Sequence, residues 1–262
     1  MFFTLNFFII IFDKILMSKA IMLKKSKIQT FTPELVLEGN NKKFYTSEEE
    51  NCLIMKFKDS IVLRNGTVFK MKGHGELRNK ISTILFEYLR NFNLLTHYIK
   101  PIDETSMLVR KLNMIPIKVV VRNIAAGNFC DRFGIEKGTL LDQPVIELYY
   151  KNNSAQYPFV NEYHIYALHI STPEEIAMIT RTASKINAIL RSFFERRNLK
   201  FVDARFEFGI LGDDIVLGDE ISPRTCRIWD GETNEPLDFE RVRLNMGNIR
   251  ESYMEILRRI SI

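Results

Sequence analysis

Charged and apolar side chains alternate over residues 201–209, which read Phe-Val-Asp-Ala-Arg-Phe-Glu-Phe-Gly. In an extended strand, this spacing places Asp203, Arg205 and Glu207 on one face and the apolar side chains on the other. Such a face can present two carboxylates and a guanidinium group to a substrate. It can equally be an exposed surface with ordinary ion pairs, and the alternation alone does not decide between these alternatives.

A further carboxylate is predicted to lie beside Glu207. Residues 212–214 form a predicted turn, after which a short strand returns and leads to Asp219. Folding this hairpin about Gly212 brings Glu207 within roughly one residue of Asp219 on the paired strands. Two carboxylates without a neighbouring His or Cys match the oxygen preference of Mg²⁺. The hairpin therefore predicts a magnesium site formed by Glu207 and Asp219.

Two arginines near strand ends could bind a phosphate. Arg122 follows the apolar run 119–121 and precedes a predicted short helix, whose first N–H groups have no partners within the helix. Arg227 follows the same hairpin as Asp219 and lies next to the only tryptophan, Trp229. A planar guanidinium group suits phosphate oxygens, although an arginine at a strand end can also be a salt-bridge partner.

Residues 39–43 read Gly-Asn-Asn-Lys-Lys and lie between two predicted strands. A glycine turn followed by lysines can direct backbone N–H groups and an ammonium group, such as that of Lys42, toward a triphosphate. A solvated basic turn is the alternative for this segment.

The elements that would position these residues mix helices with antiparallel strands. Short β-rich runs separated by turn residues occupy residues 33–72, and strands return over 107–121. A helix is predicted over 173–197, because Thr172 and Glu175 form a capping box before an apolar stripe at helical spacing. Further helices are predicted over 76–91, 125–133 and 239–259. Without regular β-α-β alternation, the fold class is α+β.

Composition places the chain among ordinary globular proteins. With 262 residues, 46% of them hydrophobic and 26% charged, the chain can bury a core and is neither disordered nor fibrous. The net charge of +5 is a mild excess that suits anionic small molecules as well as nucleic acid. Three cysteines lie far apart without a CxxC pair, which indicates a reducing compartment, and we predict a cytoplasmic location.

The first residues of the chain require a separate interpretation. Residues 2–12 are almost continuously apolar, but a spanning helix needs about 20 apolar residues. The lysines follow this run, whereas a secretory signal carries its positive charge before the apolar run. We favour an apolar and basic extension over residues 1–28 that lies outside the fold. A membrane anchor is the alternative, and we expect no stable membrane association.

Several short motifs occur in an order that resembles one known family. They read Val-Val-Val-Arg-Asn-x-Ala-Ala-Gly, Arg-Phe-Gly-Ile-x-x-Gly, Lys-Asn, Val-Asn-Glu, Val-Asp-x-x-Phe-Glu-Phe-Gly, Val-Leu-Gly-Asp-Glu-x-Ser-Pro and Arg-x-Trp-Asp. Together they resemble the SAICAR synthetase (phosphoribosylaminoimidazole-succinocarboxamide synthase) family, from about residue 35 to the C-terminus.

This resemblance implies a small antiparallel β lobe packed on a larger mixed α+β lobe, an ATP-grasp-like arrangement with ATP between the lobes. We predict that residues 29–113 form the lobe that covers the nucleotide and that residues 114–262 form the lobe with the Mg²⁺ and substrate sites. The implied activity is an ATP-dependent ligase of purine biosynthesis, which joins L-aspartate to the carboxylate of carboxyaminoimidazole ribonucleotide. Its partners would be these small molecules, ATP and Mg²⁺, without nucleic acid; the oligomeric state, including a homo-oligomer, is left open.

The resemblance also implies roles for residues at matching positions. Glu207 and Asp219 match the Mg²⁺ ligands, and Asp203 and Arg205 match catalytic positions, the first of them near the imidazole. The matches to arginines that bind the ribonucleotide are Arg122, Arg227 and Arg243. The matches to the nucleotide site are Gly39, Lys42, Leu112, Met114 and Lys151, with the adenine edge along residues 109–114.

Some positions depart from the family pattern. Arg205 replaces a lysine and Arg224 replaces an aspartate; the other replacements are Asn40, Asn128 and Tyr157. They leave two alternatives to an active enzyme open, namely a nucleotide-binding relative without turnover and a ligase for another acid. We expect Arg224 to point to solvent, because at close range it would repel Arg227. Contact with the carboxylates of the acid substrate is the alternative for Arg224.

Overall fold

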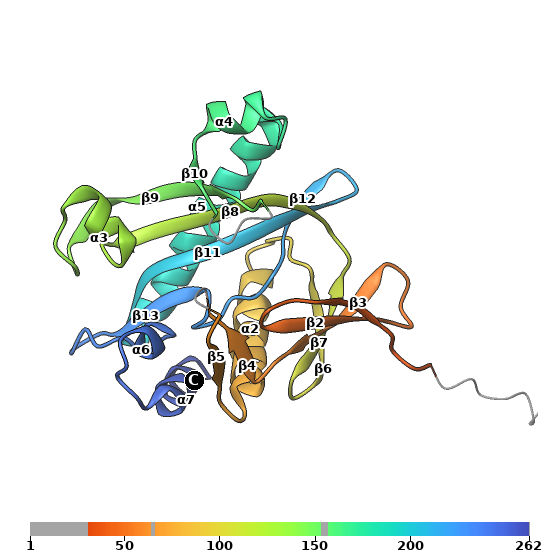
Figure 1. Cartoon of the computed structure of the whole chain (residues 1–262), viewed down its shortest axis with the longest axis horizontal. Helices are drawn as coiled ribbons and strands as arrows, with labels where there is room; N and C mark the ends of the chain where they lie inside the picture. Colours follow the sequence, from red (N-terminus) through yellow and green to blue (C-terminus); the bar gives the residue numbers. More distant parts are fainter. Residues whose placement is uncertain (1–30, 64–65, 153–156, 262) are drawn as a thin grey trace, which may run out of the picture. The chain divides into compact units, whose positions relative to one another are not determined.

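The structure is a computed structural model that describes residues 31–63, 66–152 and 157–261 (Figure 1). Two compact units divide the chain, Met1–Pro33 and Glu34–Ile262, and every helix and strand below belongs to the second unit. The predicted extension over residues 1–28 lies outside the described residues. No helix in the described part of the chain is long and apolar enough to cross a membrane.

The first half of the chain builds a five-stranded antiparallel sheet in the order β1-β2-β3-β7-β6. Its strands are β1 (Leu35–Glu38), β2 (Lys42–Thr46), β3 (Cys52–Phe57), β6 (Tyr98–Asp103) and β7 (Ser106–Arg110). A separate two-stranded hairpin follows β3 and consists of β4 (Ser60–Val62) and β5 (Val68–Lys70). The connection between them includes residues 64–65, which lie outside the described residues.

The second half builds a six-stranded antiparallel sheet in the order β10-β9-β8-β11-β12, in which β13 also pairs with β11. Its strands are β8 (Asn113–Ile124), β9 (Leu140–Tyr150), β10 (Phe159–Val160), β11 (Leu199–Leu211), β12 (Asp214–Leu217) and β13 (Cys226–Asp230). The first sheet ends at Arg110 and the second begins at Asn113. The α+β class and antiparallel sheets predicted from the sequence are confirmed; the division into lobes at residue 113 stays a prediction.

Two long helices cover the sheets and close the core. Helix α2 (His74–Arg90) packs on β3, β6 and β7, whereas α5 (Pro173–Glu195) packs on β11 and β8 (Figure 1). Helix α7 (Ile249–Ile260) packs against α2. The predicted capping box at Thr172 and Glu175 is confirmed, and the apolar stripe of α5 is buried, which explains why this helix begins where the sequence predicts.

The remaining helices are short: α3 (Asn128–Phe133), α4 (Glu162–Ala167) and α6 (Glu240–Arg243). The prediction of one helix over 239–259 is wrong, because the chain breaks between α6 and α7. Asn245, Gly247 and Asn248 all have positive φ there, a conformation that ends a right-handed helix. The predicted helix over 125–133 begins later, at Asn128, because β8 continues to Ile124.

Candidate active site

Strand β11 and the return strand β12 place the two predicted metal ligands side by side. Phe208 pairs with Leu217, and the backbone N–H of Gly218 donates to the carbonyl of Glu207 at 2.9 Å. Asp219 follows directly, with a positive φ of 60°. The register predicted for this hairpin is therefore confirmed, and the backbone brings Glu207 and Asp219 together at the end of β12.

Lysines from three other strands contact these carboxylates. Lys151, just after β9, forms an ion pair with Glu207, and Lys118 on β8 lies 3.6 Å from the same carboxylate. Lys42, the first residue of β2, forms an ion pair with Asp219. Burial opposes the charge of Lys42 and Lys151, but their carboxylate partners outweigh it and raise the pKa of both ammonium groups. For Lys118, burial dominates and lowers the pKa.

The donor set at this point fits Mg²⁺ better than a softer metal. Glu207 and Asp219 offer only oxygen atoms, and no group of three or more His, Cys, Asp or Glu side chains that could bind a metal occurs among the described residues. Mg²⁺ commonly binds proteins through one or two carboxylates, with substrate phosphates and water completing its coordination. Two carboxylates are therefore sufficient here if a nucleotide supplies further oxygens.

A buried network next to Asp219 was not predicted from the sequence. Glu220 accepts hydrogen bonds from Arg78 Nε at 2.9 Å and from Ser222 Oγ at 2.6 Å, and Lys42 lies 3.1 Å away. Burial raises the pKa of Glu220, but Arg78 and Lys42 outweigh this effect and hold it well below its ordinary value. A charge on the buried face of helix α2, beside Leu77 and Ile81, is the sequence signal that could have revealed Arg78.

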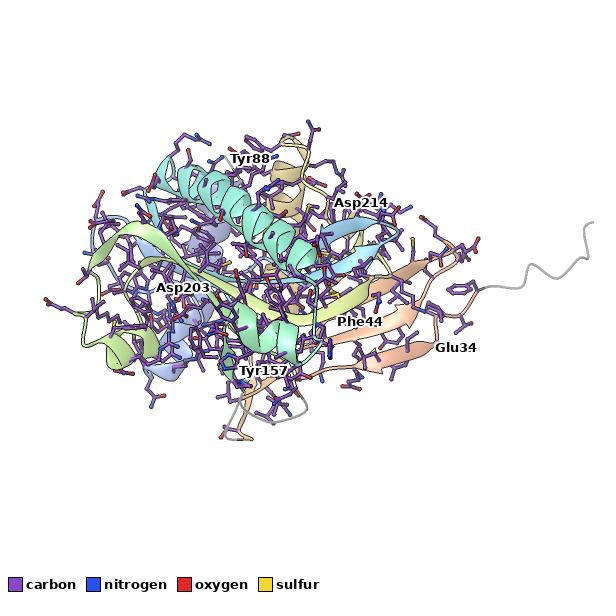
Figure 2. The ribbon with its side chains drawn as sticks, turned by 90° about the horizontal axis from the view of Figure 1, so that it is seen from above. Glu34, Phe44, Tyr88, Tyr157, Asp203 and Asp214 are labelled. Atoms are coloured by element: carbon purple, nitrogen blue, oxygen red, sulfur yellow. The ribbon has the colours of Figure 1, made fainter. Side chains whose placement is uncertain are left out.

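Two predicted phosphate-binding arginines meet at Asp203. Strand β11 lies between β8 and β13, and Asp203 is in register with Arg122 on one side and Arg227 on the other. Asp203 accepts a hydrogen bond from Arg122 Nη1 at 3.0 Å and forms an ion pair with Arg227. Figure 2 labels Asp203, which belongs to β11 of the six-stranded sheet, and Phe44, which belongs to β2 of the five-stranded sheet. The two guanidinium groups are therefore fixed next to each other by one fully buried carboxylate.

Strand β9 and helix α3 supply further partners of Arg122. Glu147 accepts from Arg122 Nε at 2.7 Å and also forms an ion pair with Arg132. Asn128, one of the substituted positions, accepts from Arg122 Nη2 at 3.3 Å. Glu147 was missed because β9 was not predicted. The role of Glu147 depends on contacts with Arg122 on the neighbouring strand, and the sequence of one strand does not show such contacts.

Gly127 permits the close approach of Arg227. The φ of Gly127 is 60°, and a side chain at this position would overlap the guanidinium group of Arg227. Only glycine combines this backbone conformation with the required space. This explains the glycine in the Ala-Ala-Gly motif, which leads into α3.

Most of the predicted nucleotide-binding residues contact Glu207, Asp219 or the glycines near them. A turn closed by a 2.9 Å bond from Gly39 N–H to the carbonyl of Lys42 directs Lys42 toward Asp219. Leu112 and Met114 approach Gly209 so closely that a Cβ atom there would lie 2.8 Å from Leu112 Cβ and 3.1 Å from Met114 Sδ. The structure thus brings Lys42 and Lys151 against the two carboxylates, and Met114 against Gly209 and Gly218; whether they bind nucleotide stays a prediction.

Two further arginines approach each other next to these clusters: Arg205 on β11 and Arg224 in the loop before β13. Arg205 Nη1 approaches the carbonyl oxygen of Arg224 at 3.5 Å. Burial, together with Arg227, Arg243 and Arg224, lowers the pKa of Arg205 to about 10, against the opposite effect of Asp203.

The expectation that Arg224 points to solvent is wrong: its guanidinium carbon lies 4.7 Å from the ring centre of Phe239, and Nε is buried. The cation–π contact with Phe239 compensates the guanidinium group of Arg224 for the water that it loses.

Two other substituted positions have ordinary surroundings. The ammonium group of Lys118 lies 4.5 Å from the ring centre of Tyr157, a cation–π contact in addition to its ion pair with Glu207. Asn40 is exposed in the turn between β1 and β2.

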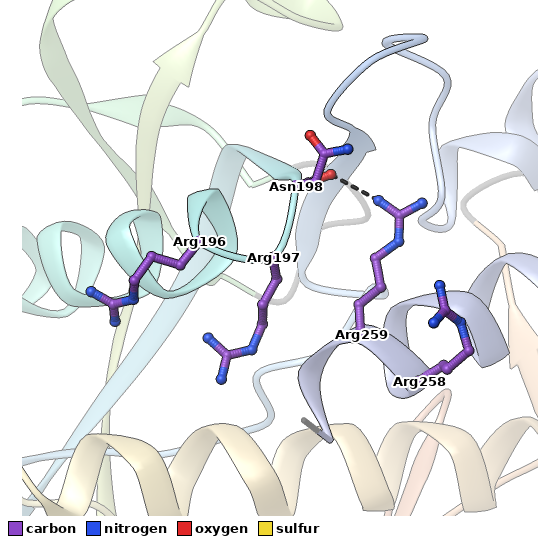
Figure 3. A pocket seen from close by; sticks show the side chains of 5 residues that line it. All are labelled: Arg196, Arg197, Asn198, Arg258 and Arg259. Carbon is purple, nitrogen blue, oxygen red and sulfur yellow. Dashed lines mark hydrogen bonds between the residues drawn. The ribbon is translucent and has the colours of Figure 1, made fainter.

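A separate basic cavity of about 640 Å³ lies where helices α5 and α7 end (Figure 3). It is lined by Arg196, Arg197, Asn198, Arg258 and Arg259. Arg259 bonds to the carbonyl of Asn198 at 2.8 Å and pairs with Asp230 and Glu255. Cations near helix C-termini are stabilised by the partial negative charge of the last carbonyls. We interpret this cavity as a structural feature of the two helix ends.

The fold places a cluster of arginines around Asp203 and a cluster of carboxylates and lysines around Glu207, and both clusters are centred on β11. The sequence model of the SAICAR synthetase family matches residues 35–260. The chain belongs to the SAICAR synthetase family.

Individual relatives cover nearly the whole matched region. The chain is 43% identical over 231 residues to a phosphoribosylaminoimidazole-succinocarboxamide synthase from Thermoanaerobacter sp. (strain X514), covering 87% of this chain and 97% of the relative. A solved synthase from Ehrlichia chaffeensis is 40% identical with a TM-score of 0.84, covering 87% and 98% of the two chains. A SAICAR synthetase solved in complex with ADP is 39% identical with a TM-score of 0.83, covering 87% and 97%.

Proposed function

We propose that this protein is an ATP-dependent ligase that forms SAICAR in purine biosynthesis. ATP, L-aspartate and carboxyaminoimidazole ribonucleotide would give SAICAR, ADP and phosphate. The observation that carries the proposal is the face of β11, where Asp203 organises two arginines and, four residues further along the strand, Glu207 lies opposite Gly218, next to Asp219. The names of the relatives and the ADP complex of one of them support the same activity.

The chemistry requires both ends of this face. A carboxylate is a poor acyl electrophile, so the γ-phosphoryl group of ATP is first transferred to its oxygen. The amine of aspartate then attacks the acyl phosphate, forms the amide bond and expels phosphate. For phosphoryl transfer, the protein contributes mainly positioning and neutralisation of charge.

On the nucleotide side, Glu207 and Asp219 would bind Mg²⁺. When bound, Mg²⁺ would neutralise charge on the ATP phosphates. Lys42 and Lys151 already lie against these carboxylates, so they are close enough to contact the phosphates once a metal competes for their partners. Met114 and Leu112 would line the adenine side, largely through backbone atoms.

On the substrate side, Arg122, Arg227 and Arg243 would bind the ribonucleotide. Guanidinium groups form charge-assisted hydrogen bonds with phosphate oxygens. Asp203 contributes by fixing the orientation of Arg122 and Arg227, and its second oxygen, Oδ1, has no hydrogen-bond partner among the described residues. That oxygen could accept a hydrogen bond from the imidazole part of the substrate, with Arg205 beside it.

A coupled assay tests this function directly. The full chain is incubated with ATP, Mg²⁺, L-aspartate and carboxyaminoimidazole ribonucleotide, and the succinocarboxamide product is measured together with ADP. Glu207→Gln removes one negative charge at nearly constant shape, and we expect it to lose metal-dependent ATP binding and turnover. Product formation by the parent chain supports the proposal. ATP binding without product would instead indicate a nucleotide-binding relative or a ligase for another acid.

The cellular location follows from the same proposal. The structure has free thiols at Cys52, Cys130 and Cys226, and purine synthesis uses soluble phosphorylated substrates. Free thiols are typical of a reducing compartment. We therefore place the reaction in the cytoplasm.

A further inference from the structure

Most charged groups of the candidate site have an opposite charge beside them. Glu207 and Asp219 are paired with lysines, Glu220 with Arg78, and Asp203 with two arginines. Arg205 and Arg224 differ from this pattern: among the described residues neither forms an ion pair with a carboxylate within 4 Å, although Asp203 and Glu220 influence them from farther away. Arg205 and Arg224 therefore carry positive charges that no direct ion pair with a carboxylate balances in the described part of the chain.

The guanidinium group of Arg224 is held in place without such a partner. It lies over the ring of Phe239 at 4.7 Å, and its backbone N–H donates to Ser222 Oγ at 3.1 Å. Ser222 belongs to the loop that also carries Asp219 and Glu220, so the position of Arg224 is tied to the candidate metal site. The residue is half-buried, which leaves part of it accessible to a small ligand.

No acid of the described chain is available to neutralise Arg224. Glu220 is the carboxylate with the main electrostatic effect on Arg224, but Glu220 already binds Arg78, Lys42 and Ser222. The ring of His74 stacks on Phe239 and also contacts the ring of Tyr253. Both His74 and Tyr253 are fully buried, and both have polar atoms without a hydrogen-bond partner among the described residues. Burial lowers the pKa of His74 to about 3, so His74 is neutral and Tyr253 brings no charge either.

We propose that Arg224 is a specificity residue that binds a carboxylate of the amine substrate, a small dicarboxylate. This inference rests on the proposed function, which requires such a substrate next to the acyl phosphate. A guanidinium group stacked on an aromatic ring can still donate in its plane to a carboxylate. The replacement of the family's aspartate by Arg224 then adds a contact to the acid substrate and does not merely weaken an old one.

Three variants of the full chain separate charge from packing. Arg224→Met keeps an apolar side chain on Phe239 and removes the charge, Arg224→Lys keeps the charge, and Arg224→Asp introduces the family residue. Arg258→Met is the matched control, because Arg258 is an exposed arginine whose one ion-pair partner in the described part of the chain is Glu255 in α7. Steady-state kinetics give KM for L-aspartate, KM for ATP and kcat, and calorimetry gives the affinity of succinate for the enzyme with MgADP.

We expect Arg224→Met to raise KM for L-aspartate and to weaken succinate binding by about 10- to 100-fold, as for loss of a hydrogen bond to a charged group. KM for ATP and kcat should change less than about threefold, Arg224→Lys should recover part of the loss, and Arg224→Asp should be the weakest. Unchanged aspartate and succinate values in Arg224→Met would overturn the inference, as would improved turnover in Arg224→Asp.

The two proposals fail differently. If the parent chain forms SAICAR and Arg224→Met retains the parent KM for L-aspartate, only the role of Arg224 is wrong. If the parent chain forms no SAICAR, calorimetry still decides, because succinate binding that depends on Arg224 supports the carboxylate contact and binding that does not depend on it contradicts the contact.

Discussion

Arg227 illustrates how one side chain can serve both structure and binding. Its guanidinium group pairs with buried Asp203 and lies against Gly127, so its orientation is fixed from two sides. A lysine would keep the positive charge next to Asp203 but would lose the planar set of donors that matches a phosphate. The structural and binding roles can therefore be separated by a conservative substitution.

For Arg227→Lys, we expect KM for the ribonucleotide to rise about 10- to 100-fold while KM for ATP stays within about threefold. Initial-rate kinetics with each substrate varied in turn measure both values. Thermal unfolding serves as the control, since the retained charge should limit the loss of stability. A parallel rise of both KM values would indicate a structural salt bridge and no specific contact with the ribonucleotide.

Lys151 forms an ion pair with Glu207 and would therefore compete with a metal ion for this carboxylate. Removing its ammonium group without shortening the side chain greatly, in Lys151→Met, should raise the affinity of the protein for Mg²⁺ alone, because a positive neighbour no longer occupies the carboxylate. The same change should lower the affinity for MgATP if Lys151 contacts the phosphates. Competition with Mn²⁺ observed by electron paramagnetic resonance measures the first effect, and calorimetry with MgATP the second. Loss of both affinities would contradict this competition.

At the scale of single residues, the sequence predicted Glu207, Asp219 and the arginine positions because strand alternation and a tight turn are local. Arg78, Glu147 and Glu220 could not be assigned in the same way. Their partners lie on other elements, and cross-strand or helix-to-loop contacts depend on the tertiary arrangement. The orientation of Arg224 was predicted wrongly for the same reason, since Phe239 is distant in the sequence.

At the scale of elements, helix α2 is linked to the loop after β12 by a buried ion pair. Arg78 and Glu220 are both almost inaccessible, and Ser82 Oγ adds a 3.0 Å hydrogen bond to the carbonyl of Ile221. This loop carries Asp219, so the position of a candidate metal ligand depends on α2. Breaking a buried pair is costly because the remaining charge stays buried.

We expect Arg78→Ala to lower the free energy of unfolding by about 3–5 kcal/mol, since Glu220 would lose its main partner. Glu220→Gln in the same background should cost little more, because the carboxylate that needed compensation is then absent. Urea unfolding of both single variants and of the double variant measures this coupling. Additive losses would show that the two side chains do not act as a pair.

The same scale shows where local signals suffice and where they fail. The capping box of α5 and its apolar stripe lie within one segment, so its start was predicted correctly. Strand β9 was missed because it includes Asp142, Gln143 and Pro144, residues that disfavour strands, and it is stabilised by pairing with β8. The break before α7 depends on Asn245 and Gly247 in left-handed conformations, which the continuing apolar pattern obscured.

At the scale of the whole folded unit, the candidate site joins parts of the chain that belong to different sheets. Lys42 comes from the five-stranded sheet, whereas Glu207 comes from the six-stranded sheet and Asp219 follows the strand paired with it. The backbone also crosses between them, because His97 N–H donates to the carbonyl of Leu217 at 2.8 Å. A ligand that contacts Lys42 and Lys151 together with the two carboxylates would add further links between the two sheets.

Such a ligand should stabilise the whole unit by mass action. At a concentration about 100 times its Kd, a ligand that binds only the folded state adds about 2.7 kcal/mol to the free energy of unfolding. For a domain of this size, each kcal/mol shifts Tm by about 2–4 °C, so saturating MgATP should raise Tm by roughly 5–10 °C. ATP with EDTA should give a much smaller shift, because the carboxylates would then repel the phosphates.

Glu207→Gln should lose most of the shift with MgATP, and scanning fluorimetry measures all three conditions. An equal rise of Tm with and without Mg²⁺ would show that Glu207 and Asp219 do not bind the metal of the nucleotide complex.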